Sequence, residues 1–159
     1  MAKGKRPVKS EYTPKNPEKY KGKYPIICRS SWERTANEFF DNHPYVTMWS
    51  SESIEIRYRH PLTGRWTVYI PDYLVVYHDG KGRSFGEIVE IKPLKESVFE
   101  DESGNWRAAI TPKGRGAREV VATQVVNMAK WQAAKAYCRK MGLKFTVLTE
   151  RELFAWSRK

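Results

Sequence analysis

The stretch from residue 69 to residue 93, YIPDYLVVYHDGKGRSFGEIVEIKP, decides the fold, because it predicts two apolar strands joined by a tight turn. The turn lies at residues 79–82, where glycine and aspartate are concentrated. Three charged residues interrupt strands that should be buried: Asp72 in the first strand, and Glu90 and Lys92 in the second. Since an isolated charge is costly to bury, we interpret this group as a functional site that the sheet supports.

The geometry of a strand predicts that these charges lie together. Successive side chains point to opposite faces, so Glu90 and Lys92 share one face, about 7 Å apart. The turn makes the two strands neighbours, which brings Asp72 beside Glu90. Two carboxylates that close repel each other unless a proton or a cation intervenes, and Mg²⁺ suits such a pair together with substrate phosphate. Spacing alone leaves an alternative open, in which Asp72 and Lys92 form a buried ion pair and Glu90 is exposed.

The composition indicates one basic domain with a polyanionic partner. The chain has 159 residues, 40% of them hydrophobic, which is enough for one compact core. Its net charge of +11 favours nucleic acid as the partner. Residues 1–24 carry eight basic and two acidic side chains, a net +6. We therefore expect an extended basic arm over residues 1–24, which is either a phosphate-binding arm or a solubilising tail, before a single domain over residues 25–159. Tyr12, Tyr20 and Tyr24 are candidates to attach the arm to the body or to a partner.

The pattern beyond the arm predicts an α/β fold. Ser30 is a good cap for a first helix, and the sequence TERE from Thr149 has the form of a capping box. Residues 93–118 look irregular, and Gly142 is a suitable stop for the long helix that follows them. The expected elements are a helix from Ser31 to about residue 42, strands at 45–49, 54–59, 65–77 and 84–92, a helix at 119–141, a strand at 145–148 and a last helix.

The chain resembles a known group of nucleases. Pro71-Asp72 followed by Glu90-Ile91-Lys92 is similar to the signature of the PD-(D/E)xK nucleases, whose restriction-endonuclease-like core (αβββαβ) is a mixed sheet flanked by helices. More closely, the chain resembles phage head-completion nucleases of T-even type, and more distantly transposon end-cleaving endonucleases and phage junction-resolving enzymes. The segments that carry the closer resemblance are PKNPEKY (14–20), RSSWE (29–33), YIPDY (69–73), VEIKP (89–93), NMAKWQAAKAYC (127–138) and FTVLTEREL (145–153).

This resemblance implies magnesium-dependent hydrolysis of DNA phosphodiesters, with Mn²⁺ as a substitute, in phage head completion after DNA packaging. By position, Asp72 and Glu90 would hold the metal and Lys92 would assist the nucleophile. Relatives often take a further acid from the first helix, which here is Glu33. An acid is also favourable there simply because it lies at a helix N-terminus. Glu87 ranks below Glu90, because Glu87 has no lysine two residues further on.

Several polar residues around this group are candidates for DNA contact. Three lie at helical spacing in the long helix, three in the glycine-containing loop before it, and two flank the charged group. For the helical residues, a solvated polar stripe is an equally good interpretation. The candidates are Gln124, Asn127 and Lys130, then Lys113, Arg115 and Arg118, then Arg29 and Lys95.

The sequence also narrows the partners and leaves two competing functions. We expect DNA and phage head, portal or neck proteins as partners, with no membrane and no nucleotide cofactor, because the chain has no long apolar run and no GxxxxGK[ST] loop. The expected location is the host cytoplasm during assembly, with incorporation into the virion as an option. One alternative is a structural, DNA-binding head-completion protein of the virion with a vestigial site. The other is a branched-DNA (Holliday junction) resolvase.

Overall fold

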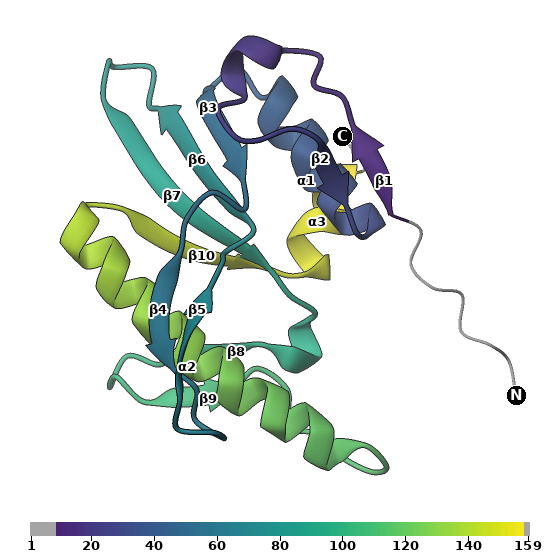
Figure 1. Cartoon of the computed structure of the whole chain (residues 1–159), viewed down its shortest axis with the longest axis vertical. Coiled ribbons are helices and arrows are strands. Elements are labelled where there is room, and N and C mark those ends of the chain that lie inside the picture. The colour runs from purple at the N-terminus through teal and green to yellow at the C-terminus, as the bar shows by residue number, and fades with distance from the viewer. Residues whose placement is uncertain (1–8, 158–159) are drawn as a thin grey trace, which may run out of the picture.

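A mixed four-stranded sheet forms the centre of the protein (Figure 1). The computed structural model describes residues 9–157. The strands in spatial order are β10 (Lys144–Leu148), β7 (Ser84–Ile91), β6 (Tyr73–His78) and β3 (Val46–Ser51). Neighbouring strands are antiparallel except β10, which joins β7 in parallel. A parallel neighbour requires a crossover connection, and the long helix α2 (Ala117–Met141) supplies it.

Strand alternation distributes the core over the two faces of this sheet. Val89 and Ile91 of β7 lie in the apolar cluster on the side of α1 (Ser31–Asn42) and α3 (Glu150–Ser157). Ile88 lies in the cluster on the other side, where Trp131 of α2 packs. Residues one apart on β7 therefore belong to different layers, as the period of a strand requires. These elements confirm the expected α/β class with a mixed sheet flanked by helices.

The ends of the helices follow the expected caps. The Ser30 side chain accepts a hydrogen bond from the Glu33 N–H and begins α1. At α3, the Thr149 N–H and hydroxyl both donate to the Glu152 carboxylate, at 2.7 and 2.8 Å, as in a capping box. Gly142, in the left-handed conformation, ends α2. Within residues 9–157, no helix has the length and apolar character needed to cross a membrane.

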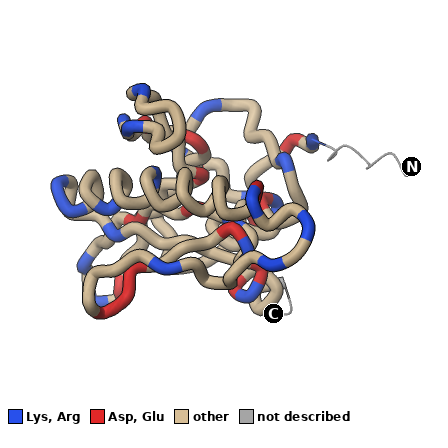
Figure 2. Tube along the Cα trace, turned by 90° about the horizontal axis from the view of Figure 1, so that it is seen from below, with Lys and Arg blue, Asp and Glu red and all other residues tan. Residues whose placement is uncertain are grey.

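Two hairpins lie on opposite sides of α2 (Figures 1 and 2). The first pairs β4 (Ile56–Arg59) with β5 (Trp66–Tyr69), and the second pairs β8 (Val98–Glu100) with β9 (Trp106–Ala108). The prediction of one strand over residues 65–77 was wrong, because the chain breaks between Tyr69 and Tyr73, where Pro71 offers no N–H to a ladder. The prediction of an irregular segment at 93–118 was also wrong in part, since it contains the second hairpin and the short helix η2 (Leu94–Glu96).

The N-terminal segment differs from the extended arm expected over residues 1–24. From residue 9 onward it forms β1 (Ser10–Tyr12), the short helix η1 (Pro17–Lys19) and then β2 (Ile26–Cys28), which pairs with β1. Tyr12 and Tyr20 are buried in the core, whereas Tyr24 is exposed. The high charge of the segment predicted an extended arm, but burial of the Tyr12 and Tyr20 rings in the core stabilises an ordered structure despite that charge. The part of the expected arm at residues 1–8 lies outside the described residues.

A single buried carboxylate holds this segment against α1. Asp41, near the end of α1, is fully buried. Its side chain accepts hydrogen bonds from the Tyr12 hydroxyl at 2.9 Å and from the N–H groups of Lys15 and Asn16 at 2.7 and 3.1 Å. The Asn16 side chain donates in turn to the Asp41 carbonyl at 2.9 Å. The main chain at Lys15 and Asn16 is therefore held by one acid about 25 residues further along the chain.

We expect Asp41→Ala to lower the free energy of unfolding by about 3 kcal/mol, because one buried and two partly buried donors lose their acceptor. Urea denaturation measures this change, and limited trypsin digestion should show faster cleavage after Lys15. The matched control is Glu38→Ala, which removes an exposed acid one turn earlier in α1. Equal stability of the two variants would contradict this account.

Candidate active site

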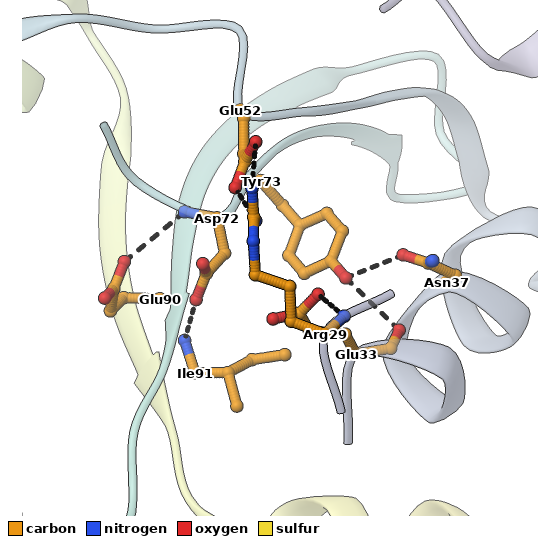
Figure 3. A network of polar contacts seen from close by, with 8 residues as sticks. All are labelled: Arg29, Glu33, Asn37, Glu52, Asp72, Tyr73, Glu90 and Ile91. Carbon is orange, nitrogen blue, oxygen red and sulfur yellow. Dashed lines mark hydrogen bonds and ion pairs between the residues drawn. The ribbon is translucent and has the colours of Figure 1, made fainter. Parts of the chain in front are cut away.

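The break between β5 and β6 places Asp72 against the end of β7. Asp72 Oδ2 accepts a hydrogen bond from the Ile91 N–H at 2.7 Å. In return, the Asp72 N–H donates to Oε2 of Glu90 at 3.3 Å (Figure 3). The two acids are therefore fixed side by side by main-chain hydrogen bonds. This agrees with the proximity expected from the sequence, although Asp72 lies between two strands and not within one.

A tyrosine that the sequence analysis did not single out completes this arrangement. The Tyr69 hydroxyl donates to the same Oε2 of Glu90 at 2.7 Å. Nζ of Lys92 lies 3.9 Å from the other oxygen, Oε1. Nζ of Lys130 lies 5.6 Å from the centre of the Tyr69 ring. The only signal for Tyr69 in the sequence was its place at the start of YIPDY, just before the break.

Burial changes the protonation of the two acids. Glu90 is only 5% exposed. Burial, together with the charge of Glu90, raises the pKa of Asp72 to about 8, against the opposing effect of the Ile91 N–H. Burial also raises the pKa of Glu90, while the Tyr69 hydroxyl and Lys92 lower it. Such a pair holds a proton near neutral pH, and a divalent cation between the acids would replace that proton.

The donor chemistry of this pair fits a divalent metal ion. Among the described residues, Oδ1 of Asp72 accepts no hydrogen bond, and Oε1 of Glu90 faces only Lys92. Each acid thus has one oxygen held in place by the protein and one left for a ligand. Carboxylate oxygens are the ligands that Mg²⁺ prefers. Within residues 9–157, however, no three His, Cys, Asp or Glu side chains are gathered closely enough to form a metal site by themselves.

The third predicted acid, Glu33, lies across an open hollow from this pair. The hollow, about 410 Å³ in volume, is lined by Glu33, Asp72 and Lys92 among others. The Glu33 carboxylate accepts a hydrogen bond from the Arg29 N–H at 2.8 Å, and its charge contributes to the raised pKa of Asp72. The structure thus brings Glu33 to the same hollow, with its carboxylate bound to the main chain (Figure 3).

Arg29 lines a neighbouring hollow together with Glu52 and is paired with that acid. Its guanidinium forms an ion pair with Glu52 (Figure 3). Glu52 has a φ of 50°, in the left-handed region that residues other than glycine seldom adopt. The Glu52 N–H donates to the Asp72 carbonyl at 2.9 Å. The segment that restrains Arg29 is therefore tied to the main chain of the site.

Two of the predicted DNA contacts are buried and bind main-chain carbonyls, although Asn127 also lines a hollow with Lys92 and Lys130. Gln124 is buried, and its amide donates to the carbonyls of Lys95 and Ile110 at 3.0 and 3.1 Å. Asn127 is buried too, and its amide donates to the Glu96 carbonyl at 3.0 Å. These side chains hold the segment after β7 against α2. The helical spacing identified the correct face of α2 but could not tell a buried amide from one exposed to DNA.

The other predicted DNA contacts fall into two groups. Lys130 is near the site and half-buried, and burial lowers its pKa. Four others are exposed: Lys95 follows β7, Lys113 and Arg115 precede α2, and Arg118 lies in its first turn. Glu87 lines an apolar hollow with Phe39 and Val89, away from Glu90, which agrees with its lower rank.

The sheet and its acidic pair define a nuclease of the PD-(D/E)xK type. The family model "TnsA-like endonuclease N terminal" matches residues 43–150, a range that includes Asp72, Glu90 and Lys92. The head completion nuclease of Enterobacteria phage T4 is 35% identical over 146 residues, which cover 91% of this chain and 93% of that protein. No solved structure matches significantly. The chain belongs to the TnsA-like endonuclease family and is a DNA endonuclease.

The raised pKa of Asp72 leads to a prediction about stability. A carboxyl whose folded pKa exceeds its unfolded pKa binds more protons in the folded state, so metal-free stability should fall as the pH rises from about 4 to about 8. Asp72→Asn removes this penalty. We expect the variant to melt about 4 °C above the wild type at pH 8 in EDTA, with little difference at pH 5.

Thermal melts of the two proteins across this pH range measure the effect. The matched control is Glu102→Gln, which neutralises an exposed acid between β8 and β9 and should show no such crossover. An Asp72→Asn protein that is less stable than the wild type at pH 8 would overturn the assignment of an unfavourable acid pair.

Proposed function

We propose that the chain is a magnesium-dependent DNA endonuclease in which Asp72 and Glu90 hold the metal ion. The observation that carries this proposal is the geometry of the buried acid pair, because two carboxylates held side by side by main-chain hydrogen bonds repel each other unless a proton or a cation lies between them. Phosphate is the natural further ligand of an ion held by one or two carboxylates. A bound Mg²⁺ would neutralise charge on the phosphate and lower the pKa of a coordinated water.

The protein side chains would orient and neutralise the reacting groups. Tyr69 and the Asp72 N–H both bind Oε2 of Glu90, which leaves Oε1 directed toward Lys92. The ammonium of Lys92 borders the hollow that also contains Asp72 and Glu33. From there it would stabilise negative charge on the attacking oxygen or on the phosphate. We assign Lys92 the role of assisting the nucleophile.

The biological setting is proposed from the T4 relative. That protein is named a head completion nuclease, and the similarity extends over nearly the whole of both chains. We propose that the present chain also acts in phage head completion, in the host cytoplasm during assembly, with head, portal or neck proteins as partners. We further propose a single nuclease domain into whose core Tyr12 and Tyr20 pack, with the basic residues of 1–24 providing contacts to DNA or to those partners.

We expect Lys92→Ala to reduce metal-dependent nicking of supercoiled plasmid by at least about 100-fold, because the transition state loses a nearby positive charge. The measurement compares cleavage with Mg²⁺, with Mn²⁺ and with EDTA. The matched control is Lys81→Ala, which removes an exposed lysine in the turn between β6 and β7 and should cleave normally.

Wild-type activity in EDTA, or equal activity of the two lysine variants, would refute the proposed site. A phage that depends on this chain tests the setting: Lys92→Ala should fail to restore infectious particles, whereas Lys81→Ala should restore them. Full restoration by an inactive Lys92→Ala protein would instead support a structural role in the head.

Glu33 is tested separately, because it lies outside the matched range and is bound to the main chain. If Glu33 contributes to metal binding, Glu33→Gln should raise the Mg²⁺ concentration needed for half-maximal nicking by about 10-fold, since one negative charge near the ion is lost. Glu38→Gln, an exposed acid on the same helix, is the control. An unchanged metal requirement would leave Glu33 only its role at the helix N-terminus.

A further inference from the structure

The hairpin of β4 and β5 has an outer face of unusual composition. Its inner face is formed by Ile56, Tyr58 and Tyr69, which are buried in the cluster next to α2. On the outer face, each arginine of β4 lies opposite an apolar residue of β5. Arg57 pairs with Val68, and Arg59 pairs with Trp66.

Trp66 is the most exposed large apolar residue on this face. It is 64% exposed, and the guanidinium of Arg57 lies 5.6 Å from the centre of its ring. Val68 of the same strand is 45% exposed, and Ile70, just after the strand ends, is 46% exposed. An exposed row of apolar side chains on a monomer commonly marks a binding surface. Flanking arginines favour a partner that combines flat apolar faces with negative charge.

The hairpin is continuous with the candidate active site. Tyr69, the last residue of β5, donates its hydroxyl to Glu90. At the other end, His60 and Leu62 of the turn line a hollow of about 290 Å³ together with Lys92 and Lys130. DNA bound over the acid pair would therefore pass next to this hairpin.

The distribution of charge around α2 supports this path. In Figure 2 the hairpin of β4 and β5 lies on one side of α2, and its trace carries Lys or Arg positions. On the opposite side lies the hairpin of β8 and β9, where Glu100 ends β8 and Asp101 and Glu102 begin the turn. Glu100 is paired with Lys135 and Asp101 with Arg107, so the basic charge there is offset and a polyanion is attracted more strongly to the first side.

We propose that the outer face of the β4–β5 hairpin binds unpaired bases of DNA next to the cleaved phosphate, with Trp66 stacking on a base and Arg57 and Arg59 contacting the backbone. This inference rests on the proposed function, since it places the substrate over Asp72 and Glu90. In a duplex, both faces of each base are covered by its neighbours. A side chain on the surface can therefore stack only where a base is unpaired or at an end. The substrate class is DNA with a single-stranded segment next to the cleaved phosphate.

The test measures binding without cleavage. Fluorescence anisotropy in EDTA compares the full-length wild type with Trp66→Ala on two DNAs of equal duplex length, one blunt and one with a single-stranded overhang. We expect Trp66→Ala to bind the overhang DNA about 10-fold more weakly, as for loss of one stacked base, and to bind the blunt DNA within about 2-fold of the wild type. Trp66→Phe should retain most of the affinity for the overhang, because it keeps a flat ring.

Two control variants separate stacking from general effects. Phe99→Ala removes an exposed ring from β8, on the acidic side of α2, and should leave both affinities unchanged. Arg57→Gln should weaken binding to both DNAs and reduce its salt dependence, because a phosphate contact is independent of base pairing. Equal losses on both DNAs for Trp66→Ala, or no loss on either, would overturn the stacking proposal and leave this face to a protein partner.

The outcome is independent of the proposed catalytic chemistry. Binding in EDTA requires no metal and no cleavage, so a failure of plasmid nicking leaves this test intact. Conversely, a chain that nicks plasmid normally but shows no overhang preference would refute only the inference about the hairpin. A melting curve for each variant confirms that the hairpin substitutions leave the fold intact.

Discussion

The structure around the site depends on the reciprocal hydrogen bonds between the main chain and the two acids. Asp72 accepts from the N–H that follows Glu90, and Glu90 accepts from the N–H of Asp72. Each acid is thereby oriented by the backbone that carries the other. This fixes two carboxylates closer together than their charges favour, at a position where burial prevents water from screening them. The rest of the fold provides the stability that this arrangement costs.

Pro71 explains how the chain reaches this geometry. Without an N–H at residue 71, the strand that begins at Trp66 cannot continue its ladder into β6. The chain therefore pairs with β4 before the break and with β7 after it. One consequence is that Tyr69 turns toward Glu90 from the hairpin side, while Asp72 approaches from the sheet side. The acid pair lies where two separate sheets meet, so it is supported from both.

The sequence was sufficient for the parts of the site that follow strand periodicity. Alternation along β7 correctly placed Glu90 beside Lys92, and apart from Glu87. It was insufficient where tertiary packing decides. The burial of Gln124 depends on carbonyls of a segment some 29 residues away, which no local pattern reveals. Likewise, Asp41 binds Tyr12, Lys15 and Asn16, which lie in a stretch that composition alone describes as a charged arm.

Two positive side chains near the acid pair, Lys92 and Arg29, are themselves paired with acids, which bears on how substrate and metal would bind. Lys92 lies 3.9 Å from Glu90, and Arg29 is held by Glu52. A DNA phosphate entering the hollow would compete with these acids for Lys92 and Arg29. A metal ion would compete with Lys92 for Glu90. A metal ion that binds Glu90 frees Lys92 for the phosphate, and a phosphate that binds Lys92 frees Glu90 for the metal ion. We therefore expect phosphate and metal to favour each other's binding, as thermodynamic linkage between coupled sites requires. A site built in this way keeps its charges balanced until both ligands are present.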